Sequence, residues 1–486
     1  MTTTALCATI TAPTMAELRR RRDLAVGADL VELRLDGVAG VDVAGALEGR
    51  RCPVVVTCRP TWQGGHFDGD EATRVRLLEE AWAAGAEFID VEDGAGDDFV
   101  ARVHGQRIVR SFHDFAGMPS DIPGRLRRMA QSADVVKLAV TASRLSDVVT
   151  LRDHGREVAG RSVLLAMGQA GVTSRILAAR LGSRWTYAGD GVAPGQLPLA
   201  PMRDEYRVQH IGSGTAIFGV VGRPVEHSLS PVMHNAAFAA AGLDAVYVPL
   251  AAADWDDFQS FARAFDVRGV SVTAPFKPDA AAAANSTDWL AARLGAVNTL
   301  RAHDGGWQAR NTDVDGFLAP LIGRDLSHQR VAVLGAGGAA RAVAEALRPR
   351  AASVTIHARR VDAAEAVAGA TGTRGAGWPP SPTAWDVLVN TTPVGTWPQV
   401  GDSPLTLDGD LAGRLVYDLV YNPPETALLA QARSRGADTL GGLPMLVAQA
   451  AAQFQWWTGI TPSTDHMHAA ALGRLRSRHV STTEPV

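Results

Sequence analysis

The sequence is poor in cysteine, has no long apolar run and carries nearly balanced charge. Its 486 residues include three cysteines, Cys7, Cys52 and Cys58, an odd number without a C-x-x-C pattern, which argues against a disulfide framework or a zinc site. No run approaches the roughly 18 apolar residues of a membrane span. The opening residues lack the charged and apolar regions of a signal peptide. With a net charge of −4, we expect a cytoplasmic protein that binds neither nucleic acid nor membrane.

Short apolar segments alternate with amphipathic helical segments over the first 210 residues. The expected strands are residues 5–10, 30–35, 53–59, 88–92, 107–113, 135–140, 163–167 and 185–189. Alternating strands and helices favour a parallel sheet, and eight such units are the number that closes a (β/α)₈ TIM barrel. We therefore predict an α/β protein in which residues 1–210 form this barrel.

The βα pattern resumes after IGSGT (211–215), which we interpret as a linker. Residues 331–347, VAVLGAGGAARAVAEAL, combine a strand, a glycine-rich turn and the start of a helix, a pattern typical of a Rossmann-type nucleotide domain. We predict this domain over 325–444 and a substrate-binding domain over 216–320, completed by C-terminal helices at 445–476. The last ten residues, 477–486, are expected to form a frayed tail.

Reactive side chains gather at the ends of the expected barrel strands, where this fold places its active site. Lys137 interrupts the apolar segment VVKLAV, and strand alternation places it on the same face as Val135 and Ala139. If the fully apolar face packs on the helices, Lys137 points into the barrel. Burial there favours the neutral amine that forms a Schiff base with a ketone or aldehyde. For the lysine alone, a side chain that reaches solvent is the alternative.

Other polar residues near strand ends suit the same chemistry. His113 is suited to proton transfer near neutral pH, and arginines can hold a carboxylate by paired hydrogen bonds. Each residue taken singly has an ordinary structural explanation, but their joint position at strand ends predicts an active site. These residues are Glu32, Arg34, Arg59, His113, Asp114, Lys137, Arg175 and Gln196.

The motifs VELRLD, TCRP-x-x-x-GG, SFHDF, VVKLAV, SRIL and APGQ run over the whole barrel, and together they resemble the type I 3-dehydroquinate dehydratases. The resemblance implies that 3-dehydroquinate loses water to give 3-dehydroshikimate, without a metal. It implies Lys137 as the Schiff-base lysine and His113 as the general acid and base. It also implies substrate contacts from Arg59, Arg175 and Gln196, supported by Glu32 and Arg34.

Two positions depart from the family pattern. Four residues after the arginine that corresponds to Arg59, the family usually has a glutamate, and this glutamate pairs with the catalytic histidine. This chain has Gln63 at that position. An amide can still orient His113 by a hydrogen bond, but it cannot stabilise the imidazolium by charge. The family usually has a serine before APGQ, where this chain has Val192, so one hydroxyl contact is missing.

The glycine-rich turn LGAGGAAR allows the backbone to approach a pyrophosphate at a helix N-terminus. The next strand ends in HARR, where Arg359 and Arg360 stand in place of the acidic residue that binds the ribose of NAD. We therefore expect NADP(H), whose 2′-phosphate suits two guanidinium groups. A structural glycine turn and two solvated arginines are the alternative.

The motifs HSLSP, VTAPFK, AVNT, NTDVDGF, LGAGGAAR, VYDLVYNPPET and GGLPMLVAQAA resemble the shikimate dehydrogenases over about residues 216–475. The resemblance implies Lys277 and Asp313 as the catalytic pair. It implies substrate contacts from Ser228, Ser230, Thr273, Asn298, Tyr421 and Gln449. It implies cofactor contacts from Gly335, Ala336, Gly337, Gly338, Ala339, Arg359, Arg360, Thr391, Gly442 and Met445. Ser271, which replaces a common asparagine, and Pro444, which replaces a glycine, are departures.

The two halves fit together chemically, because the product of the first is the ketone that the second reduces. The resemblance therefore predicts a bifunctional enzyme for two consecutive steps toward chorismate, acting on small molecules. One alternative is a quinate or shikimate dehydrogenase with a weak or silent barrel, and another is a ligand sensor that is not an enzyme. The sequence does not predict the oligomeric state.

Overall fold

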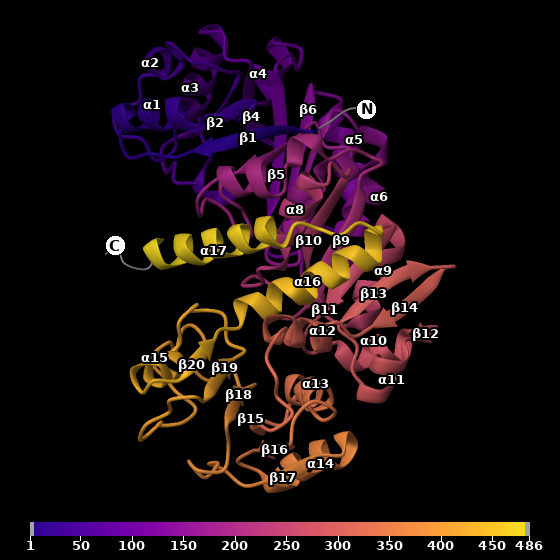
Figure 1. Ribbon diagram of the computed structural model, residues 1–486. Coiled ribbons are helices and arrows are strands. Elements are labelled where there is room, and N and C mark those ends of the chain that lie inside the picture. Colours follow the sequence, from indigo (N-terminus) through magenta and orange to yellow (C-terminus); the bar gives the residue numbers. More distant parts are fainter. Residues whose placement is uncertain (1–3, 482–486) are drawn as a thin grey trace. The chain divides into compact units, whose positions relative to one another are not determined.

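The computed structural model describes residues 4–481, with side chains described up to residue 477. The chain separates into two compact units, which are described one at a time. The first is Met1–Pro231 with Asp244–Val267, and the second is Val232–Leu243 with Arg268–Val486. Figure 1 colours the elements along the sequence. The domain boundaries expected from the sequence stay a prediction.

Eight parallel strands form the sheet of the first unit, in the order β7-β6-β5-β4-β3-β2-β1-β8 (Figure 1). Between β7 and β8, the Arg184 backbone N–H donates to the Ser162 carbonyl at 2.7 Å, so the barrel is nearly closed. The predicted TIM barrel is confirmed. Its strands are β1 (Ala5–Ile10), β2 (Leu30–Arg34), β3 (Val54–Thr57), β4 (Phe88–Glu92), β5 (Ile108–Asp114), β6 (Val135–Thr141), β7 (Ser162–Met167) and β8 (Trp185–Ala188).

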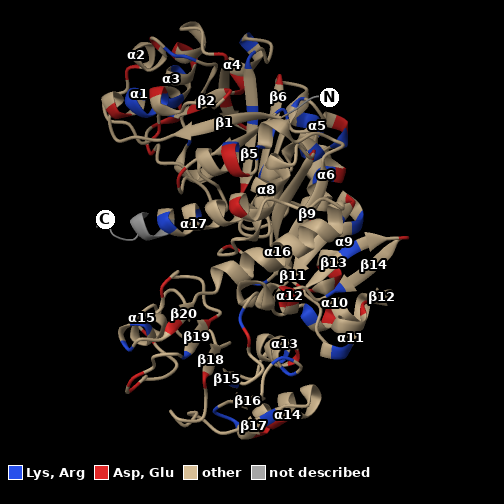
Figure 2. Cartoon of the chain, in the orientation of Figure 1, with Lys and Arg blue, Asp and Glu red and all other residues tan. Residues whose placement is uncertain are grey.

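Several helices of the barrel begin at side chains that accept a hydrogen bond from the backbone. Thr14 caps the first helix, Asp70 the third and Asp121 the fifth. Figure 2 shows Lys and Arg close to Asp and Glu on helices such as α1 and α3. The helices are α1 (Met15–Leu24), α2 (Val43–Leu47), α3 (Glu71–Ala83), α4 (Asp97–Arg102), α5 (Ile122–Ala130), α6 (Leu145–His154) and α7 (Val172–Ile176). Single turns are η1 (Thr61–Gln63), η2 (Arg156–Val158), η3 (Ala178–Leu181), η4 (Pro201–Glu205) and η5 (Val208–His210).

The interior of the barrel confirms the face assigned to Lys137. Val135 and Ala139, which share its face of β6, are buried in the cluster that holds Val55 and Tyr187 from other strands. The side chain of Lys137 therefore points into the barrel, next to this apolar cluster, and is only 5% exposed.

The segment expected to be a linker is held in place. Arg180 of the barrel donates to the carbonyl oxygens of Ser213 and Thr215 at 2.6 and 3.3 Å. Beyond it, β9 (Ala216–Gly222) pairs in parallel with β10 (Ala245–Ala251), and α9 (Trp255–Phe265) packs against α6. Asp257 of α9 accepts backbone hydrogen bonds from Leu145 and Ser146 at 2.9 and 2.8 Å, and thereby caps a barrel helix.

A mixed sheet and several helices form the first part of the second unit. β11 (Val267–Val272) pairs antiparallel with β13 (Thr299–His303), β13 with β14 (Gly306–Arg310), and β14 in parallel with β12 (Ser286–Thr287). The helices are α8 (Ser230–Ala240), α10 (Lys277–Ala283), α11 (Trp289–Leu294), α12 (Asp313–Leu318) with the turn η6 (Ala319–Leu321), α16 (Leu443–Thr458) and α17 (Thr464–Ser481). The prediction of a frayed tail was wrong from Ser477 to Ser481, because α17 continues over these residues. The rest of the predicted tail, residues 482–486, lies outside the described part of the chain.

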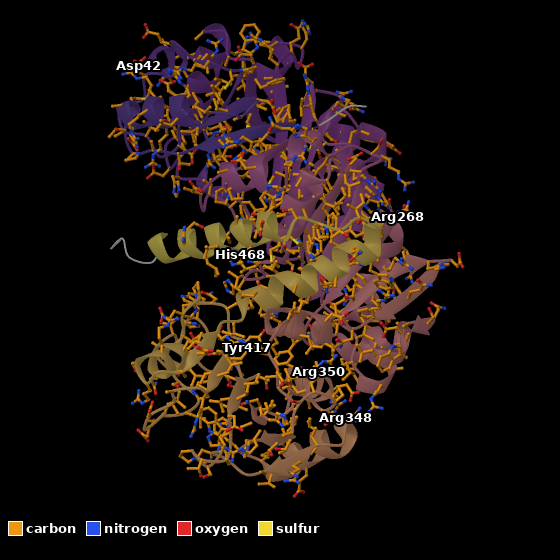
Figure 3. The ribbon with its side chains drawn as sticks, viewed as in Figure 1. Asp42, Arg268, Arg348, Arg350, Tyr417 and His468 are labelled. Atoms are coloured by element: carbon orange, nitrogen blue, oxygen red, sulfur yellow. The ribbon has the colours of Figure 1, made fainter. Side chains whose placement is uncertain are left out.

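The rest of the second unit is a parallel sheet in the order β17-β16-β15-β18-β19-β20, the order of a Rossmann fold. Tyr417 of this sheet, labelled in Figure 3, is one of its buried side chains. Its ring stacks on Phe317 of α12, with ring centroids 5.1 Å apart. The strands are β15 (Arg330–Leu334), β16 (Ser353–His357), β17 (Arg374–Ala376), β18 (Val387–Asn390), β19 (Leu415–Asp418) and β20 (Asp438–Leu440), and the helices α13 (Gly338–Leu347), α14 (Val361–Thr371) and α15 (Ala427–Ser434). Among residues 4–481, no helix is both long and apolar enough to cross a bilayer.

Candidate active sites

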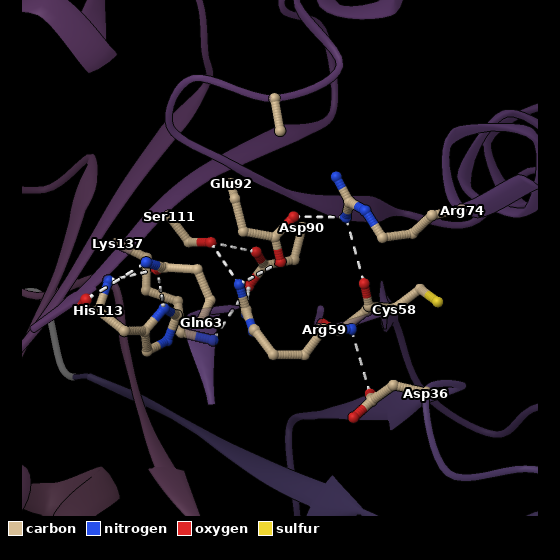
Figure 4. Close-up of polar contacts among 12 residues, drawn as sticks. Asp36, Cys58, Arg59, Gln63, Arg74, Asp90, Glu92, Ser111, His113 and Lys137 are labelled. Atoms are coloured by element: carbon tan, nitrogen blue, oxygen red, sulfur yellow. Dashed lines mark hydrogen bonds and ion pairs between the residues drawn. The ribbon is translucent and has the colours of Figure 1, made fainter. Parts of the chain in front are cut away.

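Lys137 belongs to a buried ionic cluster inside the barrel (Figure 4). Its Nζ donates to Oε1 of Glu32 and to Oδ2 of Asp90, both at 3.0 Å, and lies 4.2 Å from the centroid of the Tyr187 ring. The expectation of an apolar setting for Lys137 was wrong, because two carboxylates accept hydrogen bonds from it. The two carboxylates offset the cost of burying the charge of the lysine.

Arg59 extends the same cluster toward the outer helices (Figure 4). Its guanidinium donates to Asp90 at 2.8 Å and to Glu92 at 2.6 Å, and Glu92 also pairs with Arg74 of α3. Burial alone would raise the pKa of Asp90, but the charges of Arg59 and Lys137 hold it well below its ordinary value. Asp90 is therefore a fixed anion beside Lys137.

His113 lies at the end of β5, and Gln63 holds both its backbone and its ring (Figure 4). Gln63 Oε1 accepts from the His113 backbone N–H at 2.8 Å and lies 3.2 Å from Nδ1. Because an amide oxygen only accepts, Nδ1 must carry the ring proton when it makes this bond. The lone pair of Nε2 is then available as a base.

The surroundings of His113 disfavour its charged form. Burial, together with the positive charges of Arg59 and Lys137, lowers the pKa of His113 well below its ordinary value, and Asp90 opposes this only in part. The ring is therefore neutral at neutral pH. The orienting role expected of Gln63 matches this geometry.

Arg175 differs from Arg34 and Arg59 because no carboxylate among the described residues pairs with it. It lies in α7, the short helix after β7, and is 2% exposed, and no hydrogen bond or ion pair reaches its side chain among the described residues. Burial lowers the pKa of Arg175 to about 10. A buried, uncompensated guanidinium is costly, and an incoming carboxylate would offset that cost.

The other predicted barrel residues, Arg34 and Gln196, contact the edge of the cluster. Arg34 pairs with Asp36 at 2.7 Å, and Gln196 donates to Thr9, which donates in turn to Glu32. A cleft of about 260 Å³ opens beside them at the carboxyl ends of β1 and β8. Its lining includes Val192, the position where the family has serine, with Thr9, Thr11, Arg21 and Asp190.

Four members of this cluster were not singled out from the sequence: Asp90, Glu92, Ser111 and Tyr187. The segment FIDVE did indicate acidic residues in the site, because Asp90 and Glu92 are two residues apart and so lie on the same face of a strand. In a closed barrel that face is either the interior or the helix layer, and an interior lysine requires acidic partners.

The second unit brings together Lys277 and Asp313, which lie at the starts of α10 and α12. Lys277 Nζ lies 3.3 Å from Asp313 Oδ2, and Asn298 Nδ2 donates to Asp313 Oδ1 at 2.8 Å. Thr273 directly follows β11, the strand that leads to Lys277, and its carbonyl accepts from the Phe276 backbone N–H. Gln449 of α16 packs against Gly316 of α12, where an added Cβ would lie 2.6 Å from the Gln449 Cβ.

The other predicted substrate residues are placed as follows. Ser228 lies in the loop before α8 and Ser230 is the first residue of that helix, where its backbone N–H donates to Ser228 Oγ at 3.2 Å. Tyr421 follows β19 in the second unit and is partly exposed. The roles assigned to all these residues stay predictions.

The glycine turn of the second unit has the shape expected of a nucleotide cradle. Gly335 has φ +107°, and a Cβ there would lie 2.7 Å from Thr391 Oγ1, so only glycine fits. At Gly337 and Gly338 an added Cβ would meet no atom within 4 Å. Open space therefore lies over the N-terminus of α13, with Ala336 and Ala339 in the same turn, at the point where β15 separates β16 from β18.

Arg359 and Arg360 follow the end of β16, and both are exposed. No carboxylate among the described residues pairs with either of them. Gly442 caps α16 and approaches the Leu419 carbonyl so closely that a Cβ would lie 2.1 Å from it, and Met445 packs on the core of the sheet. These residues fit a dinucleotide with an additional phosphate on its ribose.

Comparisons with known proteins agree with the two sites. Residues 6–213 match the family model of type I 3-dehydroquinase, residues 220–300 the shikimate dehydrogenase substrate binding domain, and residues 442–472 the shikimate 5′-dehydrogenase C-terminal domain. The fold and the sites thus define a lyase barrel joined to a dehydrogenase.

The relatives identify the combination. The chain is similar to the chloroplastic bifunctional 3-dehydroquinate dehydratase/shikimate dehydrogenase of Arabidopsis thaliana, with 34% identity over 475 residues that cover 90% of this chain and 78% of the relative. It is 42% identical over 265 residues to the NADP(+) shikimate dehydrogenase of Moorella thermoacetica, covering 51% of this chain and 90% of the relative. A crystal structure of shikimate dehydrogenase with NADP+ matches 55% of this chain and 97% of its own, with 34% identity and a TM-score of 0.50. The chain belongs to the family of bifunctional 3-dehydroquinate dehydratase/shikimate dehydrogenases.

Proposed function

We propose that Lys137, His113 and Arg175 carry out the dehydration of 3-dehydroquinate, and that Lys277 and Asp313 carry out the reduction of its product to shikimate. The observation that carries the first assignment is a buried lysine beside a neutral histidine whose tautomer Gln63 fixes. The uncompensated charge of Arg175 supplies the place for the substrate carboxylate.

In the dehydration, the substrate carboxylate pairs with Arg175, and Lys137 Nζ attacks the ketone carbon. The carbonyl oxygen leaves as water with two protons from the nitrogen, and an iminium joins Lys137 to the substrate. Glu32 and Asp90, which accept hydrogen bonds from this nitrogen at 3.0 Å, hold it in position for the attack. The iminium withdraws electrons and acidifies the neighbouring C–H, so Nε2 of neutral His113 can remove that proton. His113 then returns the proton to the departing hydroxyl, and water releases the product from Lys137. No step requires a metal.

In the reduction, Lys277 donates a proton to the reacting oxygen while Asp313 orients the lysine at 3.3 Å. Asn298 and Gln449 are placed to bind substrate hydroxyls, with Ser228, Ser230, Thr273 and Tyr421 as further contacts. NADPH, when bound, supplies the hydride. The glycine turn at Gly335–Ala339, with Thr391, Gly442 and Met445, would hold its pyrophosphate and nicotinamide ends, and Arg359 and Arg360 its 2′-phosphate.

We also propose a cytoplasmic setting for this protein. Both substrates are small polar acids, and three free cysteines suit a reducing compartment such as the cytoplasm.

One assay tests the proposal. Purified protein with 3-dehydroquinate should form conjugated 3-dehydroshikimate, seen by its ultraviolet absorbance, and adding NADPH should then convert it with loss of NADPH. Borohydride added with 3-dehydroquinate should leave a stable adduct on Lys137, located by peptide mass spectrometry. Active protein with an unmodified Lys137 would contradict the Schiff base. Absence of conjugated product, with 3-dehydroshikimate still reduced, would mean a silent barrel.

A further inference from the structure

A line of hydrogen bonds between buried side chains connects Ser271 of β11 with Asp313 of the catalytic pair. Ser271 Oγ donates to Gln453 Oε1 at 2.7 Å, and Gln453 Nε2 donates to Thr299 Oγ1 at 2.9 Å. Thr299 Oγ1 donates to Asn298 Oδ1 at 2.7 Å, and Asn298 Nδ2 donates to Asp313 Oδ1 at 2.8 Å. The four residues before Asp313 are each at most 9% exposed, so water does not compete for these bonds.

The backbone fixes the direction of this line. Asn298 Oδ1 accepts from the Thr312 backbone N–H at 2.9 Å, which turns the Asn298 amide nitrogen toward Asp313. Because Oδ1 only accepts, the Thr299 hydroxyl must donate its proton to it, and must therefore accept from the amide nitrogen of Gln453. Every donor in the line points toward the carboxylate of Asp313.

We propose that Gln453 and Thr299 are positioning residues of the dehydrogenase, which act through Asn298 on the Asp313–Lys277 pair. Bonds that point the same way polarise one another, so the Asn298 N–H holds Oδ1 of Asp313 more firmly. The other carboxylate oxygen, Oδ2, is then kept toward Lys277 Nζ, 3.3 Å away. The line also explains what the serine at position 271 does, because its hydroxyl supplies the first donor.

This inference rests on the proposed role of Lys277 and Asp313, and a pair of variants of one residue tests it. Thr299→Val removes the hydroxyl with little change of shape, whereas Thr299→Ser retains it. We expect Thr299→Val to lower kcat for 3-dehydroshikimate reduction about five- to tenfold, and Thr299→Ser to restore most of that rate. The solvent deuterium isotope effect on kcat should rise in Thr299→Val because proton transfer becomes slower, while KM for NADPH stays unchanged.

A second pair on α16 covers the case in which Thr299→Val does not fold. Gln453→Met removes the hydrogen bonds of this buried side chain, including those to Ser271 and Thr299, and should reproduce the loss of kcat and the larger isotope effect. Gln455→Met, at an exposed position on the same helix, should stay within about twofold of wild type.

The outcomes separate the inference from the function on which it rests. Equal kcat and equal isotope effects in Thr299→Val and Thr299→Ser would overturn the inference. A wild-type protein that reduces no 3-dehydroshikimate would overturn the proposed function itself. NADPH binding followed by fluorescence, and the dehydratase rate of the same samples, confirm that the variants are folded.

Discussion

Replacement of Gln63 by glutamate should make His113 a stronger base. Gln63 is 8% exposed and its Oε1 lies 3.2 Å from Nδ1 of His113, so a carboxylate there would face the ring directly. At an effective dielectric constant of about 20, opposite charges about 4 Å apart attract by about 4 kcal/mol. Burial of the new carboxylate offsets part of this, so we expect the pKa of His113 to rise by about 1–3 units.

The sign of the kinetic effect follows from the role of the neutral ring. His113 acts as a base when unprotonated, and its lowered pKa puts the acid limb of the dehydratase kcat/KM profile below pH 6.5 in the wild type. Gln63→Glu should move that limb upward by about 1–3 pH units. The assay is the initial rate of 3-dehydroshikimate absorbance over a wide pH range.

Two controls isolate the charge from the orientation of the ring. Gln63→Met removes the acceptor without adding a charge, so it should lower the rate about tenfold without raising the acid limb. The NADPH-dependent rate of the same proteins should not change. An acid limb that stays in place in Gln63→Glu would refute the reasoning about His113.

Three further predictions concern other parts of the chain. Arg175→Met should raise KM for 3-dehydroquinate at least about 30-fold, because the substrate carboxylate loses its partner. It should also raise the free energy of unfolding in urea by about 1–3 kcal/mol without substrate, because it removes a buried, unpaired cation; a lower value would contradict this. Arg359→Ala combined with Arg360→Ala should lower kcat/KM for NADPH about 10- to 100-fold and leave NADH unaffected, and an equal loss with both cofactors would exclude a 2′-phosphate site. Asp257→Ala should destabilise the protein by about 1–2 kcal/mol through loss of the α6 cap, whereas exposed Asp256→Ala should not; equal unfolding midpoints would argue against this cap.

The sequence predicted the barrel and the inward position of Lys137 because both depend on local periodicity. Alternation along β6 determines the face on which a side chain lies, but not what it meets there. Asp90, 47 residues away from Lys137, becomes its partner only when the barrel closes. For that reason the ion pairs were missed and an apolar setting was expected.

The polar line behind Asp313 could not be predicted for a similar reason. Gln453 is a polar residue on a helix, which usually faces water, and it is 182 residues from Ser271. Gln453 becomes buried only when α16 packs in the fold, where it bonds to Ser271 of β11 and Thr299 of β13. The motif residues, by contrast, were predicted because their spacing within short segments carries the signal.

Reciprocal inactivation of the two sites tests most directly whether one chain performs both steps. We predict that Lys137→Met loses NADPH-dependent turnover of 3-dehydroquinate but still reduces added 3-dehydroshikimate. Lys277→Met should form 3-dehydroshikimate at the wild-type rate and consume no NADPH, and a mixture of the two variants should convert 3-dehydroquinate to shikimate. Wild-type formation of 3-dehydroshikimate by Lys137→Met, or wild-type NADPH consumption by Lys277→Met, would contradict the assignment of the two steps to these two lysines.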